Sequence, residues 1–305
     1  MVSSNVKQKA LGAVSGILAN ILLGLSSVFW AFLGAVNTFT LLGYRVYFSV
    51  LAALFVVCAS GQFRELFASL NVRQLFVHAM AAVLIAVNWG VFIWASIHGR
   101  VLESSVGYLI APIITIVIGV FVYKESLSPF RAISVVAMVI GVSGLLIFSS
   151  GLDVRVYLAI GLSWGGYCSL KKMTSLNVFS GLLLESIVLA VMFTPILLFS
   201  DLSLDLPDGL GLLRTALIFS CGLVSIIPLA LFAFSSSRIS MTSLGLLQFV
   251  LPITQFIVAT VVYEQTVSVE LGVVLLVVFA GLLLTVLEPI ISTLLSSQKR
   301  RRDGT

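Results

Sequence analysis

The sequence predicts an all-α polytopic membrane protein with ten transmembrane helices, arranged as a 5+5 inverted repeat with both termini in the cytoplasm. Three observations predict this fold class: the composition, a series of long apolar runs, and an internal duplication. Of the 305 residues, 60% are hydrophobic and only 10% are charged. Soluble domains are about 45–50% apolar and about 25% charged. The surface of this chain must therefore face mostly lipid.

Ten apolar runs approach or exceed the length of about 20 residues that a helix needs to cross a bilayer. They cover residues 11–33, 41–59, 74–97, 102–122, 130–148, 153–170, 176–199, 212–235, 240–262 and 269–290. The first run follows a short polar start and is long enough to stay in the membrane, so no cleaved signal peptide is expected. The two longest links, 60–73 and 200–211, are polar and rich in turn-forming residues.

The basic residues predict the orientation. If the N-terminus is cytoplasmic, 13 of the 17 Lys and Arg residues fall on the cytoplasmic side, three fall outside, and Arg45 lies within a span. This bias matches the positive-inside rule, and the reverse orientation would invert it. Because the basic residues are spread between apolar runs, they indicate topology, and no nucleic-acid partner is expected. We expect a multi-pass protein of the cytoplasmic (inner) membrane, with a basic cytoplasmic tail at 291–305.

Residues 1–150 and 151–290 form two related units. Matching positions lie 137 to 140 residues apart in the order Gly24/Gly161, Arg100/Arg238, Ser105/Ser243, Pro112/Pro252, Tyr123/Tyr263 and Gly141/Gly281. Each unit holds five spans, which is an odd number, so the second unit is inverted relative to the first. Inverted repeats are typical of secondary transporters, whose substrate site lies near the midplane between the repeats.

Other function classes find little support. The three cysteines lie in apolar runs, no Cys/His spacing suggests a metal site, and no cofactor is expected. The chain lacks the GxxxxGK[ST] motif of ATP-driven pumps. The two histidines, His78 and His98, lie at opposite ends of one predicted helix, which argues against an intramembrane enzyme. A membrane scaffold or receptor subunit is the alternative, although no segment outside the membrane is large enough to bind a partner protein well.

Several motifs resemble a known family. They are AVNWGVFIWA at 86–95, LESSVGYLIAP at 102–112, KE at 124–125, GLLLE at 181–185, and SLGLLQFVLP at 243–252 followed by TQF at 254–256. Over nearly its whole length the chain is similar to the drug/metabolite transporter superfamily, in its EamA-like group and most closely the RarD branch. The resemblance implies a ten-helix inverted fold with cytoplasmic termini, and export or exchange of a small metabolite or drug. Glu264-Gln265 replaces Lys124-Glu125 in the second repeat, which argues against two equivalent gates.

Three ionisable residues within or beside the spans are candidate substrate-binding groups, because charges are costly in a membrane. Arg45 lies about one turn inside its helix and can bind an anionic group or extend to the outer surface. Glu103, at the start of a helix, can pair with Arg45, bind an amine, or simply favour the helix dipole. Glu185 is the deepest carboxylate and can carry a proton, bind an amine, or pair with Lys172. Arg45 and Glu185 occupy matching positions of the two units.

Amides, aromatics and prolines complete the predicted site. Asn88, Gln248 and Gln255 either bond to a neighbouring helix or face a cavity. Trp89, Trp94, Tyr108, Trp164 and Tyr167 either line a cavity for an apolar substrate or belong to the packing and the interface belt, the latter being favoured for Trp30. Pro112 and Pro252 are matched helix kinks. The row Gly107, Ala111, Thr115 and Gly119 suits close helix packing. We expect a small-molecule substrate, protons as a possible partner, and a monomer or homodimer in the lipid bilayer.

Overall fold

The computed structural model describes residues 2–148, 152–200, 202–284 and 288, and this part of the chain is helical with no strand. The helices are α1 (Val2–Phe32), α2 (Thr38–Ala59), α3 (Phe63–Ser69), α4 (Val72–Ile97), α5 (Val101–Phe121), α6 (Pro129–Phe148), α7 (Val154–Met173), α8 (Val178–Phe199), α9 (Leu212–Phe219), α10 (Cys221–Ser236), α11 (Met241–Gln248) and α12 (Val250–Val261). A further apolar helix covers Val269–Leu284. The predicted tail at 291–305 lies outside the described residues.

Eight helical segments of the described chain are long and apolar enough to cross a membrane. Two of them are formed jointly by α9–α10 and α11–α12. The other two predicted spans are also helical, but α7 carries Lys171 and Lys172 in its last turn and Val269–Leu284 is shorter. The prediction of an all-helical, multi-pass membrane protein is therefore confirmed, whereas the count of ten spans stays a prediction.

Two local features differ from the expected elements. The link 60–73 was predicted as turns, yet it contains the short helix α3, which buries Leu66. The predicted spans 212–235 and 240–262 are each broken once, at Ser220 and Phe249. Pro252 has no N–H for the carbonyl of the residue four positions earlier, which accounts for the break at Phe249. The matched Pro112 lies within α5, which is continuous.

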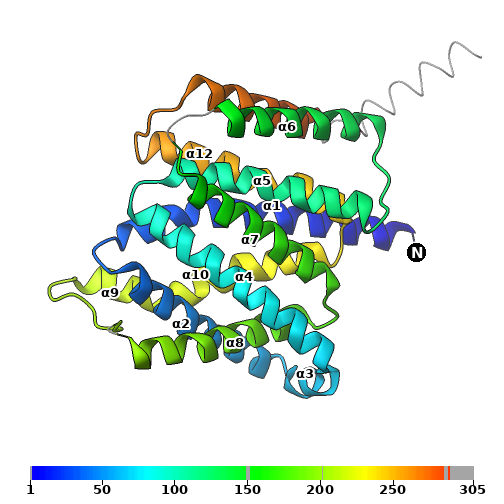
Figure 1. Ribbon diagram of the computed structural model, residues 1–305. Coiled ribbons are helices and arrows are strands. Elements are labelled where there is room, and N and C mark those ends of the chain that lie inside the picture. The colour runs from blue at the N-terminus through cyan, green and yellow to red at the C-terminus, as the bar shows by residue number, and fades with distance from the viewer. Residues whose placement is uncertain (1, 149–151, 201, 285–287, 289–305) are drawn as a thin grey trace, which may run out of the picture.

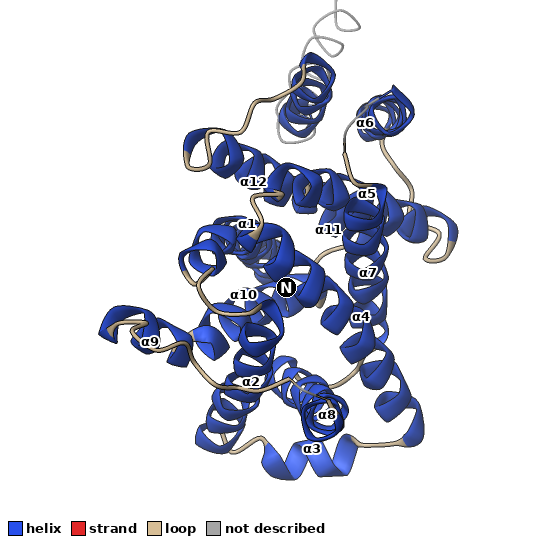
Figure 2. Cartoon of the chain, turned by 60° about the vertical axis from the view of Figure 1, so that its left-hand side comes forward, coloured by secondary structure: helices blue, strands red, loops and turns tan. Residues whose placement is uncertain are grey.

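The helices lie side by side in a bundle, with α6 and Val269–Leu284 paired at one edge (Figures 1 and 2). Met138 of α6 and Leu275 of the edge pair belong to a second apolar cluster, which also includes Val106 and Leu109 of α5 and Leu246 of α11. The main apolar core lies between α1, α2, α4, α7, α8 and α10. The N-terminus lies on the same side of the bundle as α3 (Figure 1).

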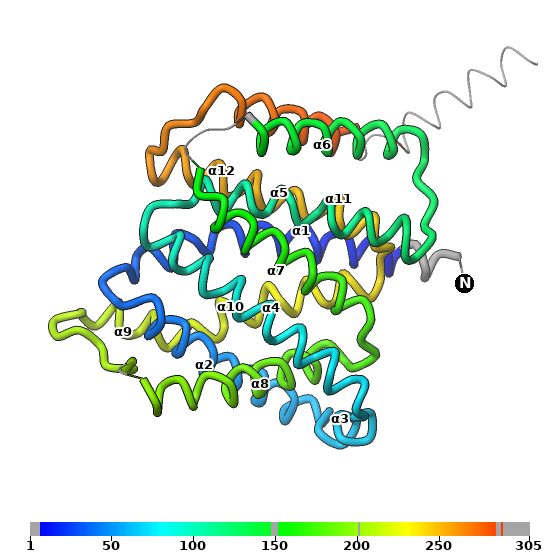
Figure 3. The backbone as a smooth tube through the Cα atoms, in the orientation of Figure 1, coloured from blue at the N-terminus to red at the C-terminus, as the bar shows by residue number. Residues whose placement is uncertain are grey.

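Small residues let α5 approach two neighbours closely. A Cβ atom at Gly107 would lie 2.8 Å from Ile160 of α7, and one at Gly119 would lie 2.8 Å from Thr242 of α11. Figure 3 shows α11 alongside α5. The small-residue row of α5 therefore serves packing within the chain, as small residues commonly do between membrane helices.

Two loops at opposite ends of the bundle have the same backbone conformation. Lys124 and Glu264 both adopt a positive φ, at 56° and 52°. After α5, the carboxylate of Glu125 accepts hydrogen bonds from the backbone N–H groups of Met241 and Thr242, at 2.7 and 2.8 Å. After α12, the Gln265 amide oxygen accepts one from the Leu102 N–H at 3.3 Å. Each loop thus holds the start of the matching helix in the other half of the chain.

Candidate functional site

Arg45 lies in the interior of the bundle. Its side chain projects from α2, and the residue is only 2% exposed. The guanidinium carbon is 3.9 Å from the ring centre of Trp89 and 4.8 Å from that of Trp30. Arg45 therefore does not extend to the outer surface. Trp30 is fully buried, so the interpretation of Trp30 as an interface-belt residue is wrong as well.

The surroundings of Arg45 are rich in hydrogen-bond donors. Arg45 Nε donates to Ser225 Oγ of α10 at 2.9 Å. Three of the buried polar groups that have no hydrogen-bond partner within the described chain belong to Arg45, to Trp30 beside it and to Ser49 on α2: Arg45 Nη1, Trp30 Nε1 and Ser49 Oγ. Ser49 follows Arg45 by four residues, so both lie on the same face of α2. The ion pairs of the described residues do not include Arg45.

Glu185 forms a second buried charge centre. The residue lies on α8 and is 3% exposed. Its Oε1 accepts a hydrogen bond from Lys171 Nζ at 2.8 Å and lies 2.7 Å from His78 Nδ1, while its Oε2 accepts one from Tyr167 Oη at 3.1 Å. Lys171 and His78 are also buried, at 6% and 0% exposure. The opposite charges of Glu185 and Lys171 therefore compensate each other.

Glu185 pairs with Lys171, and the expected pairing with Lys172 is wrong. Lys172 Nζ instead donates to the backbone carbonyls of Ser236 and Ile239, both at 2.7 Å. His78 and Lys171 were not among the predicted site residues. The only sequence signal for His78 was a histidine in the first turns of an apolar run, which by itself does not indicate a carboxylate partner.

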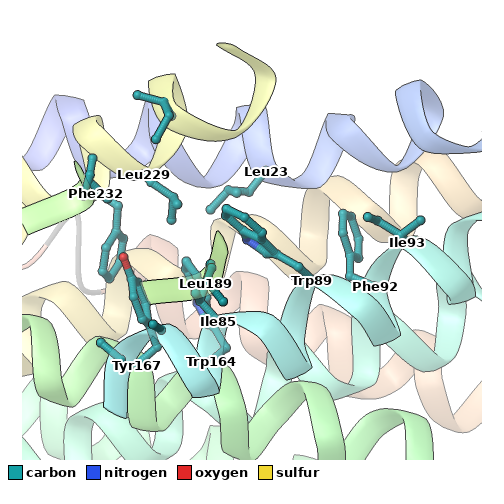
Figure 4. Close-up of a cluster of buried hydrophobic side chains, with 14 of the residues drawn as sticks. Leu23, Ile85, Trp89, Phe92, Ile93, Trp164, Tyr167, Leu189, Leu229 and Phe232 are labelled. Atoms are coloured by element: carbon teal, nitrogen blue, oxygen red, sulfur yellow. The ribbon is translucent and has the colours of Figure 1, made fainter. Parts of the chain in front are cut away.

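Aromatic and amide side chains occupy the interior between the two charge centres. Tyr108 Oη donates to Asn88 Oδ1 at 3.0 Å. Trp164 is stacked on Tyr167 with ring centres 5.5 Å apart and meets Tyr108 edge-on at 6.1 Å. Figure 4 shows Trp89, Trp164 and Tyr167 in one cluster with apolar neighbours. The structure therefore brings together five of the predicted residues, Asn88, Trp89, Tyr108, Trp164 and Tyr167.

Two of the predicted residues lie at the end of the bundle where α4 meets α5. Glu103 Oε1 is 3.4 Å from Arg100 Nη1, so it pairs with its neighbour on the next turn and not with Arg45. Trp94 is half-buried and stacked on His98, with ring centres 4.8 Å apart. Glu103 thus belongs to a separate ion pair, and Trp94 packs at the edge of the main apolar core.

The two glutamines bond to neighbouring helices. Gln248 Nε2 donates to Thr115 Oγ1 at 3.2 Å, and Gln255 lies 3.4 Å from the hydroxyl of Ser104. Pro252 is tied to α5 in the same way, because its carbonyl accepts a hydrogen bond from Ser105 Oγ at 3.0 Å. These contacts favour the packing alternative over a cavity lining for Gln248 and Gln255.

Cavities open at both ends of the bundle. A cavity of about 810 Å³ lies where α2 ends and α8 begins, with mostly apolar walls. A second cavity of about 290 Å³ shares Leu176, Val178 and Ser237 with it and is lined by Lys171. At the opposite end, a cavity of about 630 Å³ is lined by Trp94 and His98. The charge centre of Glu185 is thus adjacent to a cavity, through Lys171.

Comparison with known proteins points to bacterial transporters. The protein RarD of Streptomyces exfoliatus is 30% identical over 272 residues, covering 86% of this chain and 84% of the relative. The uncharacterized transporter YojE of Bacillus subtilis is 30% identical over 283 residues, covering 90% and 92%. RarD of Escherichia coli is 24% identical over 290 residues, covering 94% and 97%. No protein-family model matches the chain.

The fold also resembles that of a solved protein. A crystal structure with 16% sequence identity superposes with a TM-score of 0.62 over 90% of this chain and 96% of the other. At this identity the similarity concerns the fold alone.

Proposed function

The chain belongs to the RarD branch of the EamA-like drug/metabolite transporters, and on this premise we propose that it is a secondary transporter of a small organic metabolite or drug. It works by alternating access in the cytoplasmic membrane and exports or exchanges its substrate. The similarity to these relatives confirms the family that the sequence motifs indicated, and it supports a transporter in general terms. The substrate class, the direction and the mechanism are the proposed part.

The observation that carries this proposal is the buried charge within apolar helices. Arg45 of α2 and Glu185 of α8 are buried within segments that are otherwise apolar, and Lys171, in the last turn of α7, is buried against Glu185. Ionisable groups at such positions are expensive, and they typically mark substrate or ion pathways. A membrane scaffold would need no such groups, so they favour a pathway for a small molecule or ion over a scaffold.

The proposed architecture has ten spans, with α7 and Val269–Leu284 as the two beyond the eight apolar ones. The reciprocal loops at Glu125 and Gln265 support two inverted halves, because each loop contacts the opposite half in the matching place. Rocking of two such halves exposes a central site to one side and then to the other. In the predicted orientation, the end of the bundle with the N-terminus and α3 faces the cytoplasm (Figure 1).

Flux in proteoliposomes tests the proposed activity. A thermal-shift screen with amino acids, nucleosides, organic cations and antibiotics selects compounds that stabilise the folded protein by mass action. Each hit is then tested as a labelled substrate, with and without the unlabelled compound inside the vesicles. Alternating access predicts protein-dependent flux that is accelerated by substrate on the opposite side. Binding without flux above protein-free vesicles, across all hits, would favour the receptor alternative.

Single cysteines test the proposed topology. In a background without the three native cysteines, one new cysteine replaces Lys124 and another replaces Asp208. A membrane-impermeant maleimide added to intact cells should label the Asp208 position and spare the Lys124 position. The opposite pattern would reverse the orientation.

A further inference from the structure

We propose that the donor cluster around Arg45, formed with Trp30 and Ser49, binds the carboxylate of the transported molecule, and that the substrates are organic anions or zwitterions with an aromatic or apolar body. The inference rests on the proposed transport function and deepens it by naming the substrate class. It is carried by the unpaired donors and by the absence of a compensating acid among the described ion pairs.

Arg45 carries a buried charge without an acidic partner. It is 2% exposed and shares no ion pair with a described acidic residue. Buried charges in proteins are normally paired or bound to a ligand. The two tryptophan rings partly compensate the charge through cation–π contacts, but they offer no hydrogen-bond acceptor in the plane of the guanidinium. An anion is the group that this position lacks within the described chain.

The unpartnered groups at and beside Arg45 are hydrogen-bond donors. The three unpartnered groups, Arg45 Nη1, Trp30 Nε1 and Ser49 Oγ, all carry N–H or O–H donors. A carboxylate supplies two oxygens that accept several hydrogen bonds, and the planar guanidinium fork matches its geometry. A substrate ammonium group would find only one possible acceptor among these three groups, the Ser49 hydroxyl. Arg45 would also repel it. The cluster therefore favours anions over cations.

The matching position in the second half of the chain carries a charge that is already compensated. Glu185 occupies the position in the second half that matches Arg45 in the first. Its charge is compensated by Lys171 at 2.8 Å, with His78 and Tyr167 completing the coordination. Two matching positions thus differ in one respect: the charge on α8 is satisfied within the protein, whereas the charge on α2 is not. The charge centre on α8 suits a structural or coupling role, and that on α2 suits a ligand.

The body of the substrate follows from the rings beside the cluster. Trp89 and Trp30 lie against Arg45, and Phe92 and Tyr108 meet edge-on with ring centres 6.0 Å apart. Such rings bind apolar and aromatic groups well and provide few polar partners. We therefore expect a carboxylate attached to an aromatic or branched apolar group.

Matched pairs of small probes test the assignment. Phenylacetate is compared with phenylacetamide, and N-acetylphenylalanine with its amide, by tryptophan fluorescence and thermal shift on the full-length protein in detergent. The wild type should bind at least one carboxylate about tenfold more tightly than its neutral amide, which is the magnitude of one charge-assisted contact. Equal binding of acids and amides by the wild type would overturn the inference.

Variants locate the effect. Arg45→Gln should remove the preference for the acid and retain binding of the amide, and Trp30→Phe should weaken the preference while keeping the ring. Arg214→Gln is the matched control, because Arg214 also lies over an aromatic ring, Phe32 at 5.3 Å, but is not buried in the core. A preference that survives Arg45→Gln overturns the assignment. If Arg45→Gln does not fold, Arg45→Lys and Trp30→Phe decide in its place, and an unchanged preference in both has the same meaning.

Failure of this inference can be told apart from failure of the transport proposal. Flux of carboxylate substrates that is equal in the wild type and Arg45→Gln would refute the anion site and leave the transporter standing. Selective binding of carboxylates without flux in proteoliposomes would do the reverse.

Discussion

The ion pair between Glu185 and Lys171 allows a quantitative test of how the interior is held together. We consider three variants: Glu185→Gln, Lys171→Met, and the double variant. The glutamine keeps the size of the glutamate, and the methionine keeps most of the apolar length of the lysine, so each change removes charge with little change in volume. The pair is buried and its charged atoms are 2.8 Å apart.

The expected magnitudes follow from the contacts. Removing one partner of a buried ion pair costs about 3–5 kcal/mol, because the remaining charge is left uncompensated. Glu185→Gln should lie at the upper end, since no other described carboxylate pairs with Lys171. Lys171→Met should lie at the lower end, because the carboxylate keeps its contacts with His78 Nδ1 at 2.7 Å and with the Tyr167 hydroxyl at 3.1 Å. The double variant should be less destabilised than the sum by about 3 kcal/mol.

Unfolding of the four proteins in a mixed detergent system, followed by tryptophan fluorescence, gives the free energies for this cycle. Lys172→Met is the matched control, because its ammonium group bonds to the backbone carbonyls of Ser236 and Ile239 and not to a carboxylate. Combined with Glu185→Gln it should act additively, within about 0.5 kcal/mol. A coupling below about 1 kcal/mol for Lys171 and Glu185 would refute the reasoning that the two charges compensate each other in the interior.

Three further predictions concern the loop at Glu125, the helix packing at two glycines, and proton coupling at Glu185. Burial alone would raise the pKa of Glu125, but its hydrogen bonds from the start of α11 outweigh this and lower the pKa. Its stabilising effect should therefore be complete above the ordinary carboxyl pKa and decline as the pH falls through the lowered value; Glu125→Gln should cost about 1–2 kcal/mol at neutral pH and flatten this dependence in unfolding measured against pH. Gly222→Ala should destabilise by about 1–3 kcal/mol, because a Cβ there would collide with the backbone of Phe48, whereas Gly144→Ala, with open space around it, should be neutral or stabilising in the same assay. If Glu185 carries the coupled proton, Glu185→Gln should abolish the pH dependence of flux in proteoliposomes without loss of membrane insertion, and an unchanged pH profile would exclude that role.

The positions of the helices could be predicted from the sequence because apolar length is a strong signal in a membrane protein. The break at Ser220 could not, since it does not interrupt the apolar run, whereas the break at Phe249 lies three residues before Pro252, where a kink was expected. The break at Ser220 has no proline within the preceding or following turn, and Gly222 just beyond it packs against the backbone of α2. Such a break depends on the neighbouring helix, which a single apolar run does not reveal.

The partners of the charged residues were harder to predict than their depth. Consecutive residues of a helix point about 100° apart, so Lys171 and Lys172 face different neighbours although they are adjacent in sequence. Only packing decides which of them turns towards Glu185. Arg45 poses the same difficulty: α2 is apolar nearly all round, so the sequence indicates how deep Arg45 lies but not whether it faces lipid or the interior.

The two reciprocal loops suggest how a symmetric fold can work asymmetrically. In each loop a residue with a left-handed backbone, Lys124 or Glu264, precedes the side chain that holds the start of a helix in the opposite half. One does so with the carboxylate of Glu125 and two short hydrogen bonds, the other with the neutral amide of Gln265. A carboxylate at a helix N-terminus binds more strongly than an amide, because it also interacts favourably with the helix dipole. If the halves rock as proposed, the contact at Glu125 should therefore be the harder of the two to open, and the conformations open at either end should differ in population even without a substrate gradient.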